Sequence, residues 1–129
     1  MKILLMVLCF LFISCEDKSK PKRYESVVSS YPNGKPNDVY VMEGDILVGM
    51  RSYMSSGKLW IDYECDEWGT KNGRYLKYNL LNGFIEIEGT YMLNESKQSI
   101  KHGEWKEYDR NGRVIEEKTE RYYRGTKLQ

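Results

Sequence analysis

The chain has 129 residues, and its 20 Lys and Arg residues offset 19 Asp and Glu residues, which leaves a formal net charge of +1. Charges so evenly balanced give no electrostatic reason to expect nucleic acid or anionic lipid headgroups as the ligand. This length leaves room for one small domain once the N-terminal segments are set aside.

The N-terminus has the pattern of a bacterial lipoprotein signal. Lys2 precedes an unbroken apolar run over residues 3–13, which is too short for a transmembrane helix of roughly 20 residues but suits a signal-peptide core. The stretch LFISC resembles a lipobox, in which a signal peptidase cuts before a Cys that then carries lipid. The alternative is an ordinary cleaved signal with an incidental Cys. We expect residues 1–14 to be removed and Cys15 to be lipidated.

Residues 15–26 are expected to form a flexible tether. The segment EDKSKPKRYES after Cys15 has seven charged residues in eleven and no aliphatic side chain. Such a segment cannot bury enough surface to offset its ordering entropy. Acyl chains on Cys15, at about 0.8 kcal/mol per buried methylene, would hold the chain at a membrane. Cys9 would leave with the signal and Cys65 would stand alone, so no internal disulfide is expected.

A turn phrase recurs four times between residues 31 and 112. Each copy has a tyrosine, a short polar turn, a glycine and an extended segment. The tyrosines are Tyr31, Tyr53, Tyr78 and Tyr108, and the glycines, at intervals of 23, 26 and 29 residues, are Gly34, Gly57, Gly83 and Gly112. A period of roughly 20–50 residues indicates a repeat architecture in which no unit is stable alone. Asn-Gly or Ser-Gly between apolar runs supplies the positive φ that hairpin turns need.

A second phrase, Lys-x-Gly-x-aromatic, opens the last two copies as KNGRY and KHGEW. Its glycines, Gly73 and Gly103, stand near the start of predicted strands, where glycine indicates a bulge or a close backbone approach. Its aromatic residues are Tyr75 and Trp105. The intervening spacers CDEWGT and NESKQSI are expected to be longer loops.

The segments KNGRYLKY and KHGEWKEYDRNGRVIEE resemble the bacterial MORN-repeat variant proteins, many of which are labelled antitoxin-like components of toxin–antitoxin systems. The resemblance covers residues 31–123. It implies an all-β fold, an elongated and curved antiparallel sheet of stacked hairpins, which we place over residues 27–129. It implies little about activity.

No catalytic or metal-binding pattern emerges, and no cofactor is expected. His102, the only histidine, occupies the slot of Asn72 in the previous copy, and a catalytic base is not expected to interchange with Asn. The acidic cluster around Cys65 lacks zinc-like spacing and a calcium loop, with weak divalent-ion binding as the alternative. Glu86 and Glu88 alternate toward solvent on one predicted strand.

The aromatic residues allow two interpretations: a core ladder in a thin sheet, or an exposed strip for a protein or glycan ligand. Trp68 lies in a spacer and is expected to be the most exposed tryptophan. The leading hypothesis is a non-catalytic, lipid-anchored repeat module at the periplasmic or outer face of a bacterial envelope, with an unidentified protein partner. The alternatives are an immunity or antitoxin-like inhibitor of an envelope-delivered toxin and, third, a protein that binds or acts on cell-wall glycans.

Overall fold

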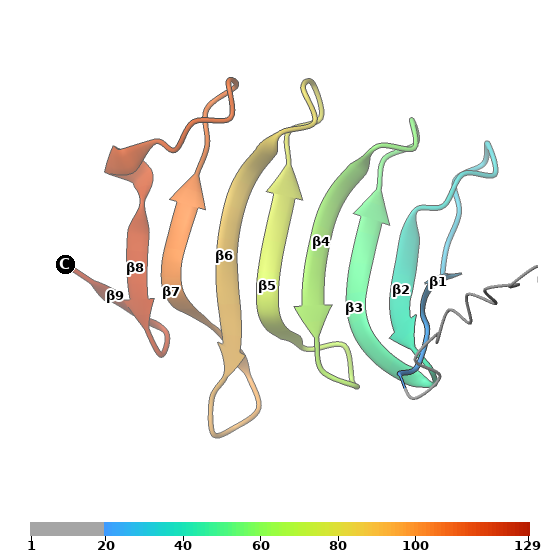
Figure 1. Cartoon of the computed structure of the whole chain (residues 1–129), viewed down its shortest axis with the longest axis horizontal. Coiled ribbons are helices and arrows are strands. Elements are labelled where there is room, and N and C mark those ends of the chain that lie inside the picture. The colour runs from blue at the N-terminus through green and yellow to red at the C-terminus, as the bar shows by residue number, and fades with distance from the viewer. Residues whose placement is uncertain (1–19) are drawn as a thin grey trace, which may run out of the picture.

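A computed structural model describes residues 20–129, which form a single open sheet of nine strands (Figure 1). The strands pair antiparallel in chain order, so the expected all-β class is confirmed. The elements are β1 (Arg23–Val27), β2 (Asp38–Glu43), β3 (Ile46–Tyr53), β4 (Leu59–Cys65), β5 (Lys71–Tyr78), β6 (Ile85–Leu93), β7 (Ser99–Glu107), the 3₁₀ helix η1 (Glu116–Lys118), β8 (Glu120–Tyr123) and β9 (Thr126–Leu128). Among the described residues, no helix is long and apolar enough to cross a membrane.

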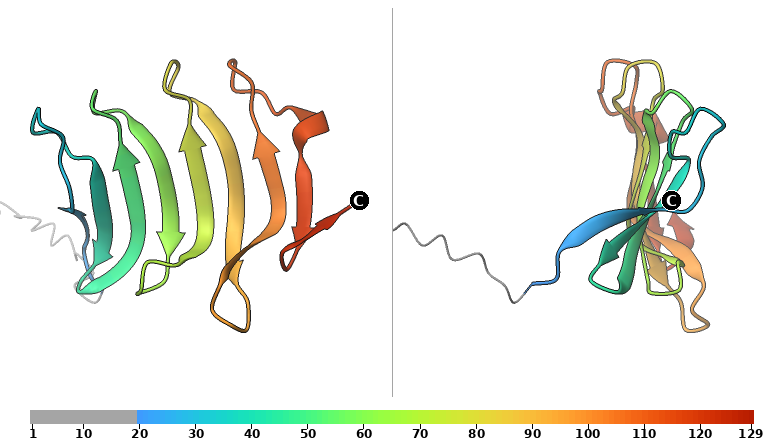
Figure 2. Two further views of the ribbon diagram at one scale, coloured as in Figure 1. Left: turned by 180° about the vertical axis from the view of Figure 1, so that it is seen from behind. Right: turned by 90° about the vertical axis from the view of Figure 1, so that its right-hand side faces the viewer.

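The sheet is one layer thick, as the edge-on view in Figure 2 shows. Within residues 20–129, no second sheet covers either face. The buried hydrophobic side chains of this part of the chain are Val39, Val41, Cys65, Leu76 and Trp105. Because so few side chains are buried, strand pairing and rows of cross-strand side chains must supply most of the stability.

The turns lie along two edges of the sheet. We call the edge with turns at residues 31–35, 54–58, 79–84 and 109–113 the upper edge, and the edge with turns at residues 43–46, 66–70, 94–98 and 123–126 the lower edge (Figure 1). The four repeat glycines lie in the upper turns with φ between 73° and 88°. The turn at residues 31–35 closes through Gly34 N–H to Tyr31 O at 2.9 Å and Tyr31 N–H to Lys35 O at 2.8 Å.

Each upper turn is fastened to the next one along the sheet. The Asn33 amide donates to Ser55 O at 2.9 Å, and Lys58 Nζ donates to Leu80 O at 3.1 Å. The Asn82 amide donates to Arg110 O at 2.8 Å. These side-chain bonds span one repeat each. The repeated turn phrase therefore supplies the contact between units as well as the turn within each unit.

The spacers at residues 66–70 and 94–98 are tight turns, so the expected longer loops are wrong. Asp66 N–H donates to Thr70 O at 2.9 Å, and Asn94 N–H donates to Gln98 O at 2.9 Å, which is the same closing pattern as at the upper edge. In the second turn Lys97, with φ 61°, takes the left-handed position that glycine usually holds. This tight turn could not be predicted from Asn-Gly, because the sequence has none at residues 94–98.

The tether predicted for residues 15–26 is too long at its C-terminal end. Residues 23–26, placed in the tether, belong to β1, which pairs along its whole length with β2. Backbone hydrogen bonds hold this edge strand, and an ion pair of 3.2 Å joins Arg23 to Glu43 across it. Charged composition argues against a hydrophobic core but not against an edge strand. The signal, Cys15 and the rest of the tether to residue 19 lie outside the described residues.

Candidate interaction surfaces

Aromatic rings form a continuous row on one face of the sheet, which we call the aromatic face. The strand register places Met50 opposite Tyr63, and Tyr63 opposite Tyr75. The ring centroids of Tyr63 and Tyr75 are 6.4 Å apart, and those of Tyr75 and Trp105 are 5.7 Å apart. Tyr91 meets the Trp105 ring edge-on at 4.9 Å. Offset and edge-on arrangements at these separations are stabilising.

Two lysines cover this row. The Lys71 ammonium lies 5.2–5.4 Å from the centroids of three tyrosine rings, and the Lys101 ammonium lies 4.5 Å from the centroid of Trp105. Such cation–π contacts stabilise both partners. Burial raises the pKa of the Tyr75 and Tyr91 hydroxyls. The rings of the row therefore pack against one another and against Lys71 and Lys101.

Trp105 is the best buried ring of the row, at 6% exposure. Its indole N–H donates to Thr90 O at 3.2 Å, and its ring lies over Gly89 of β6. A Cβ built on Gly89 would fall 2.2 Å from the ring, a separation that real Cβ atoms do not show. Gly89 is not among the positive-φ glycines, so the indole, rather than backbone conformation, requires glycine there. Glycine in a strand interior was the available sequence signal.

The two repeated phrases place their aromatic residues differently. Tyr75 and Trp105 of the Lys-x-Gly phrase lie in the aromatic row. The turn-phrase tyrosines contact backbone or carboxylates instead: Tyr31 OH donates to Tyr53 O at 2.9 Å, and Tyr108 OH donates to Glu88 at 2.6 Å. That hydrogen bond, with burial, raises the pKa of Tyr108 to about 12. Tyr78 alternates to the same face as Leu76, opposite Tyr75.

Gly73 and Gly103 lie at interruptions of the strand register. The register shifts between Tyr63 and Cys65 opposite Gly73, and between Glu88 and Thr90 opposite Gly103. Both glycines have positive φ, 115° and 74°. A Cβ on Gly73 would come within 2.9 Å of Glu64, whereas a Cβ on Gly103 would meet open space. The expected bulge occurs at both positions, and the close neighbour of Gly73 is the Glu64 side chain rather than backbone.

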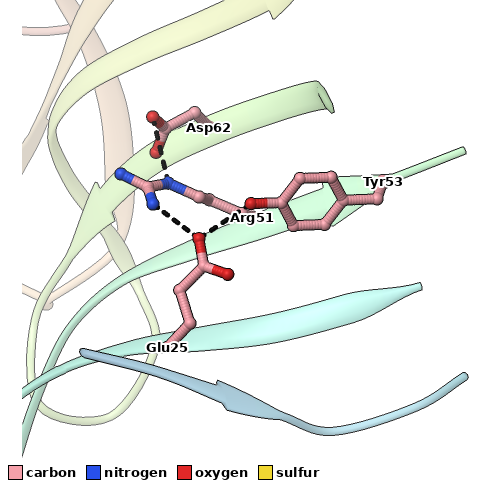
Figure 3. Close-up of polar contacts among 4 residues, drawn as sticks. All are labelled: Glu25, Arg51, Tyr53 and Asp62. Carbon is pink, nitrogen blue, oxygen red and sulfur yellow. Dashed lines mark hydrogen bonds and ion pairs between the residues drawn. The ribbon is translucent and has the colours of Figure 1, made fainter. Parts of the chain in front are cut away.

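The opposite side, which we call the charged face, carries an ionic cluster near its β1 end (Figure 3). Arg51 Nη1 donates to Glu25 Oε1 at 2.6 Å, and Tyr53 OH donates to the same oxygen at 2.7 Å. Arg51 Nε lies 3.4 Å from Asp62 Oδ2, an ion-pair contact without hydrogen-bond geometry. Partial burial disfavours the Glu25 charge, but the hydrogen bonds from Arg51 and Tyr53 outweigh it and lower the pKa of this carboxyl.

Because the pKa of Glu25 is lowered in the folded chain, the domain should lose stability as the pH falls. Glu25 ionises more readily in the folded chain, so its contribution is present above the unfolded pKa of about 4.3 and is lost as the pH falls through the folded value. Wild type should exceed Glu25→Gln in unfolding free energy at pH 7, and the gap should narrow at acid pH. Urea titrations at both pH values measure it. A gap that is constant with pH would show that the cluster does not act through the Glu25 charge.

A shallow hollow of about 410 Å³ lies farther along the charged face. Gly73 and Gly89 lie in it, and polar side chains of β4–β7 line it, namely Glu64, Arg74, Glu88, Thr90, Glu104 and Lys106. Glu64 accepts from Arg74 N–H at 2.9 Å, and Lys106 lies 3.6 Å from Glu104. Arg74 and Glu104 are exposed at its rim. The hollow is therefore lined by charged groups of both signs, three carboxylates and two cations.

The residues weighed as catalytic or metal-binding candidates have ordinary structural partners. His102 Nδ1 accepts from Arg124 N–H at 3.1 Å, and Cys65 is buried, which raises the pKa of its thiol. Glu86 lies 3.9 Å from Lys77, and Glu88 is held by Tyr108. Within residues 20–129, no group of three His, Cys, Asp or Glu side chains is arranged to hold a metal ion.

No protein-family model, curated protein or solved structure matches this chain. The resemblance to the MORN-repeat variant proteins therefore stays an expectation drawn from the repeated phrases.

Proposed function

We propose that this chain is a non-catalytic protein-binding module, a MORN-like stack of hairpins held at the surface of a bacterial envelope membrane by lipid on Cys15. One observation carries the proposal: a nine-stranded single-layer sheet presents a wide charged face that is open to solvent along the described residues. A surface of this kind suits a macromolecular ligand better than a small substrate, which needs a pocket that encloses it.

The charged face is the proposed contact surface. The rings of the aromatic face pack against one another beneath Lys71 and Lys101, which reduces the surface that they offer to a ligand. The charged face instead offers exposed groups of both signs, Arg74 and Glu104, beside the hollow. Charges arranged in this way set partner choice and orientation in protein interfaces.

Charge reversal at the hollow tests the contact surface. A partner captured from envelope extract by the lipidated chain should bind Arg74→Glu about tenfold or more weakly, the factor that corresponds to 1.4 kcal/mol. Arg110→Glu, an equal charge change in an exposed upper turn, is the matched control and should bind as wild type. Equal affinities for the two variants would exclude the charged face. A captured toxin would favour the immunity alternative.

The anchor has its own test. Cells that produce the wild-type chain with labelled palmitate should incorporate the label, and the protein should enter the detergent phase. Cys15→Ala should lose both properties, while Cys65→Ala should keep them because Cys65 is buried in the sheet. An unlabelled wild-type chain would exclude lipid anchoring.

A further inference from the structure

An apolar patch occupies the lower edge of the sheet. It consists of Trp68 in the β4–β5 turn, Ile46 and Leu47 at the start of β3, and Tyr40 and Met42 of β2, which surround one groove together with the acidic residues Asp45 and Glu67. Trp68 is 80% exposed and Ile46 is 58% exposed. Large apolar side chains exposed together mark interaction surfaces in soluble domains.

The described chain enters the fold beside this patch. Gly44 N–H donates to Lys22 O at 3.3 Å, and the Pro21 side chain is 3.3 Å from where a Gly44 Cβ would stand. Gly44 belongs to the β2–β3 turn, two residues before Ile46. Residues 21–22 are thus tied to the same corner of the lower edge as the patch.

The length of chain before residue 21 limits how far this corner can be from Cys15. Five residues lie between Cys15 and Pro21, and the six residue-to-residue steps span at most about 20–22 Å when fully extended. The upper edge is farther away by the length of a strand, which is about 27 Å for the eight residues of β3. Of the two edges, the lower one is therefore nearest to anything attached at Cys15.

We propose that the patch of Tyr40, Met42, Ile46, Leu47 and Trp68 docks onto the lipid surface to which Cys15 is anchored. This inference rests on the proposed lipid anchor. Tryptophan and tyrosine prefer the interface between headgroups and acyl chains, and Ile46 adds an apolar side chain beside them. Attachment at Cys15 keeps the local concentration of lipid high, so a weak patch suffices. The charged face and the upper edge, with Leu81 at 92% exposure, then project away from the membrane.

Chemical coupling of the chain to a lipid tests the docking of the patch independently of whether cells attach lipid to Cys15. The chain beginning at Cys15 is coupled through that thiol to a maleimide lipid in phosphatidylcholine vesicles, in a Cys65→Ala background that leaves one thiol. Some of the vesicles contain lipid brominated high on the acyl chain. Bromolipid should quench part of the tryptophan emission, and aqueous iodide should quench less than it does in solution. Both effects should disappear in Trp68→Phe.

Trp60 is the matched control because it lies at the upper end of β4, whereas Trp68 follows the lower end of the same strand. Trp60→Phe should retain the full bromolipid quenching, and Ile46→Asp should reduce it. If Trp68 stays as accessible to iodide on vesicles as in solution, the docking is excluded and the patch is free for a protein partner. A native chain that carries no lipid on Cys15 would instead refute the anchor, whatever the vesicles show.

Discussion

Gly89→Val is expected to destabilise the domain by several kcal/mol, although the substitution adds only three carbon atoms to a strand. Even the first of them, the Cβ, would lie 2.2 Å from the Trp105 ring. If the strands shifted to accommodate it, the strain would be about 1–3 kcal/mol, as for other overpacked sites. If the indole were expelled, its burial would be lost, at about 3–5 kcal/mol. The three ring atoms within 2.6 Å of that position favour expulsion.

A double-mutant cycle isolates the contact. Gly89→Ala alone should be strongly destabilising, but in a Trp105→Ala background the added methyl group has room and should change the unfolding free energy by about 1 kcal/mol or less. Urea denaturation of the four chains gives the coupling energy. Additive effects would show that Gly89 is required for a reason other than the indole above it.

The repeated turns could be predicted because their chemistry is local. Asn-Gly and Ser-Gly require positive φ between extended segments, and the four upper turns have that conformation at Gly34, Gly57, Gly83 and Gly112. The lower turns at residues 66–70 and 94–98 close through the same backbone bonds without Asn-Gly or Ser-Gly, so local patterns predict loops there. The all-β class was predicted from the upper turns alone, so the wrong assignment of two lower turns as loops did not affect it.

The two surfaces depend on register, which local patterns do not determine. Glu25 and Arg51 are 26 residues apart and meet across β2, which lies between their strands. Tyr91 joins the aromatic row although neither repeated phrase contains it. Register shifts at Gly73 and Gly103 move the following residues along the facing strand, so equivalent phrases alone could not show which rings meet. Gly89 is the residue in the sequence that indicates the Trp105 contact, because glycine inside a strand points to a neighbour that needs its space.

Trp105→Ala is expected to remove about 3–5 kcal/mol of stability, a large part of the roughly 5–15 kcal/mol available to a domain. The indole contacts Tyr75, Tyr91 and the Lys101 ammonium, and its N–H donates to Thr90 O, so truncation removes the best buried ring of the aromatic row and leaves a cavity. Trp68→Ala should change stability by no more than about 0.5 kcal/mol, because the side chain is 80% exposed. Urea denaturation followed by circular dichroism measures both.

Iodide quenching supplies the second measurement, since it reports exposure without mutating the core. In solution, iodide should quench a component of the emission that Trp68→Ala removes, and the buried Trp105 should contribute little to it. The core interpretation of the aromatic row requires both results together: a stability loss at Trp105 and a quenchable Trp68. A quenchable Trp105 whose truncation left stability unchanged would reverse the assignment of the two faces, because the rings would then be free surface and the aromatic face the better candidate for the partner.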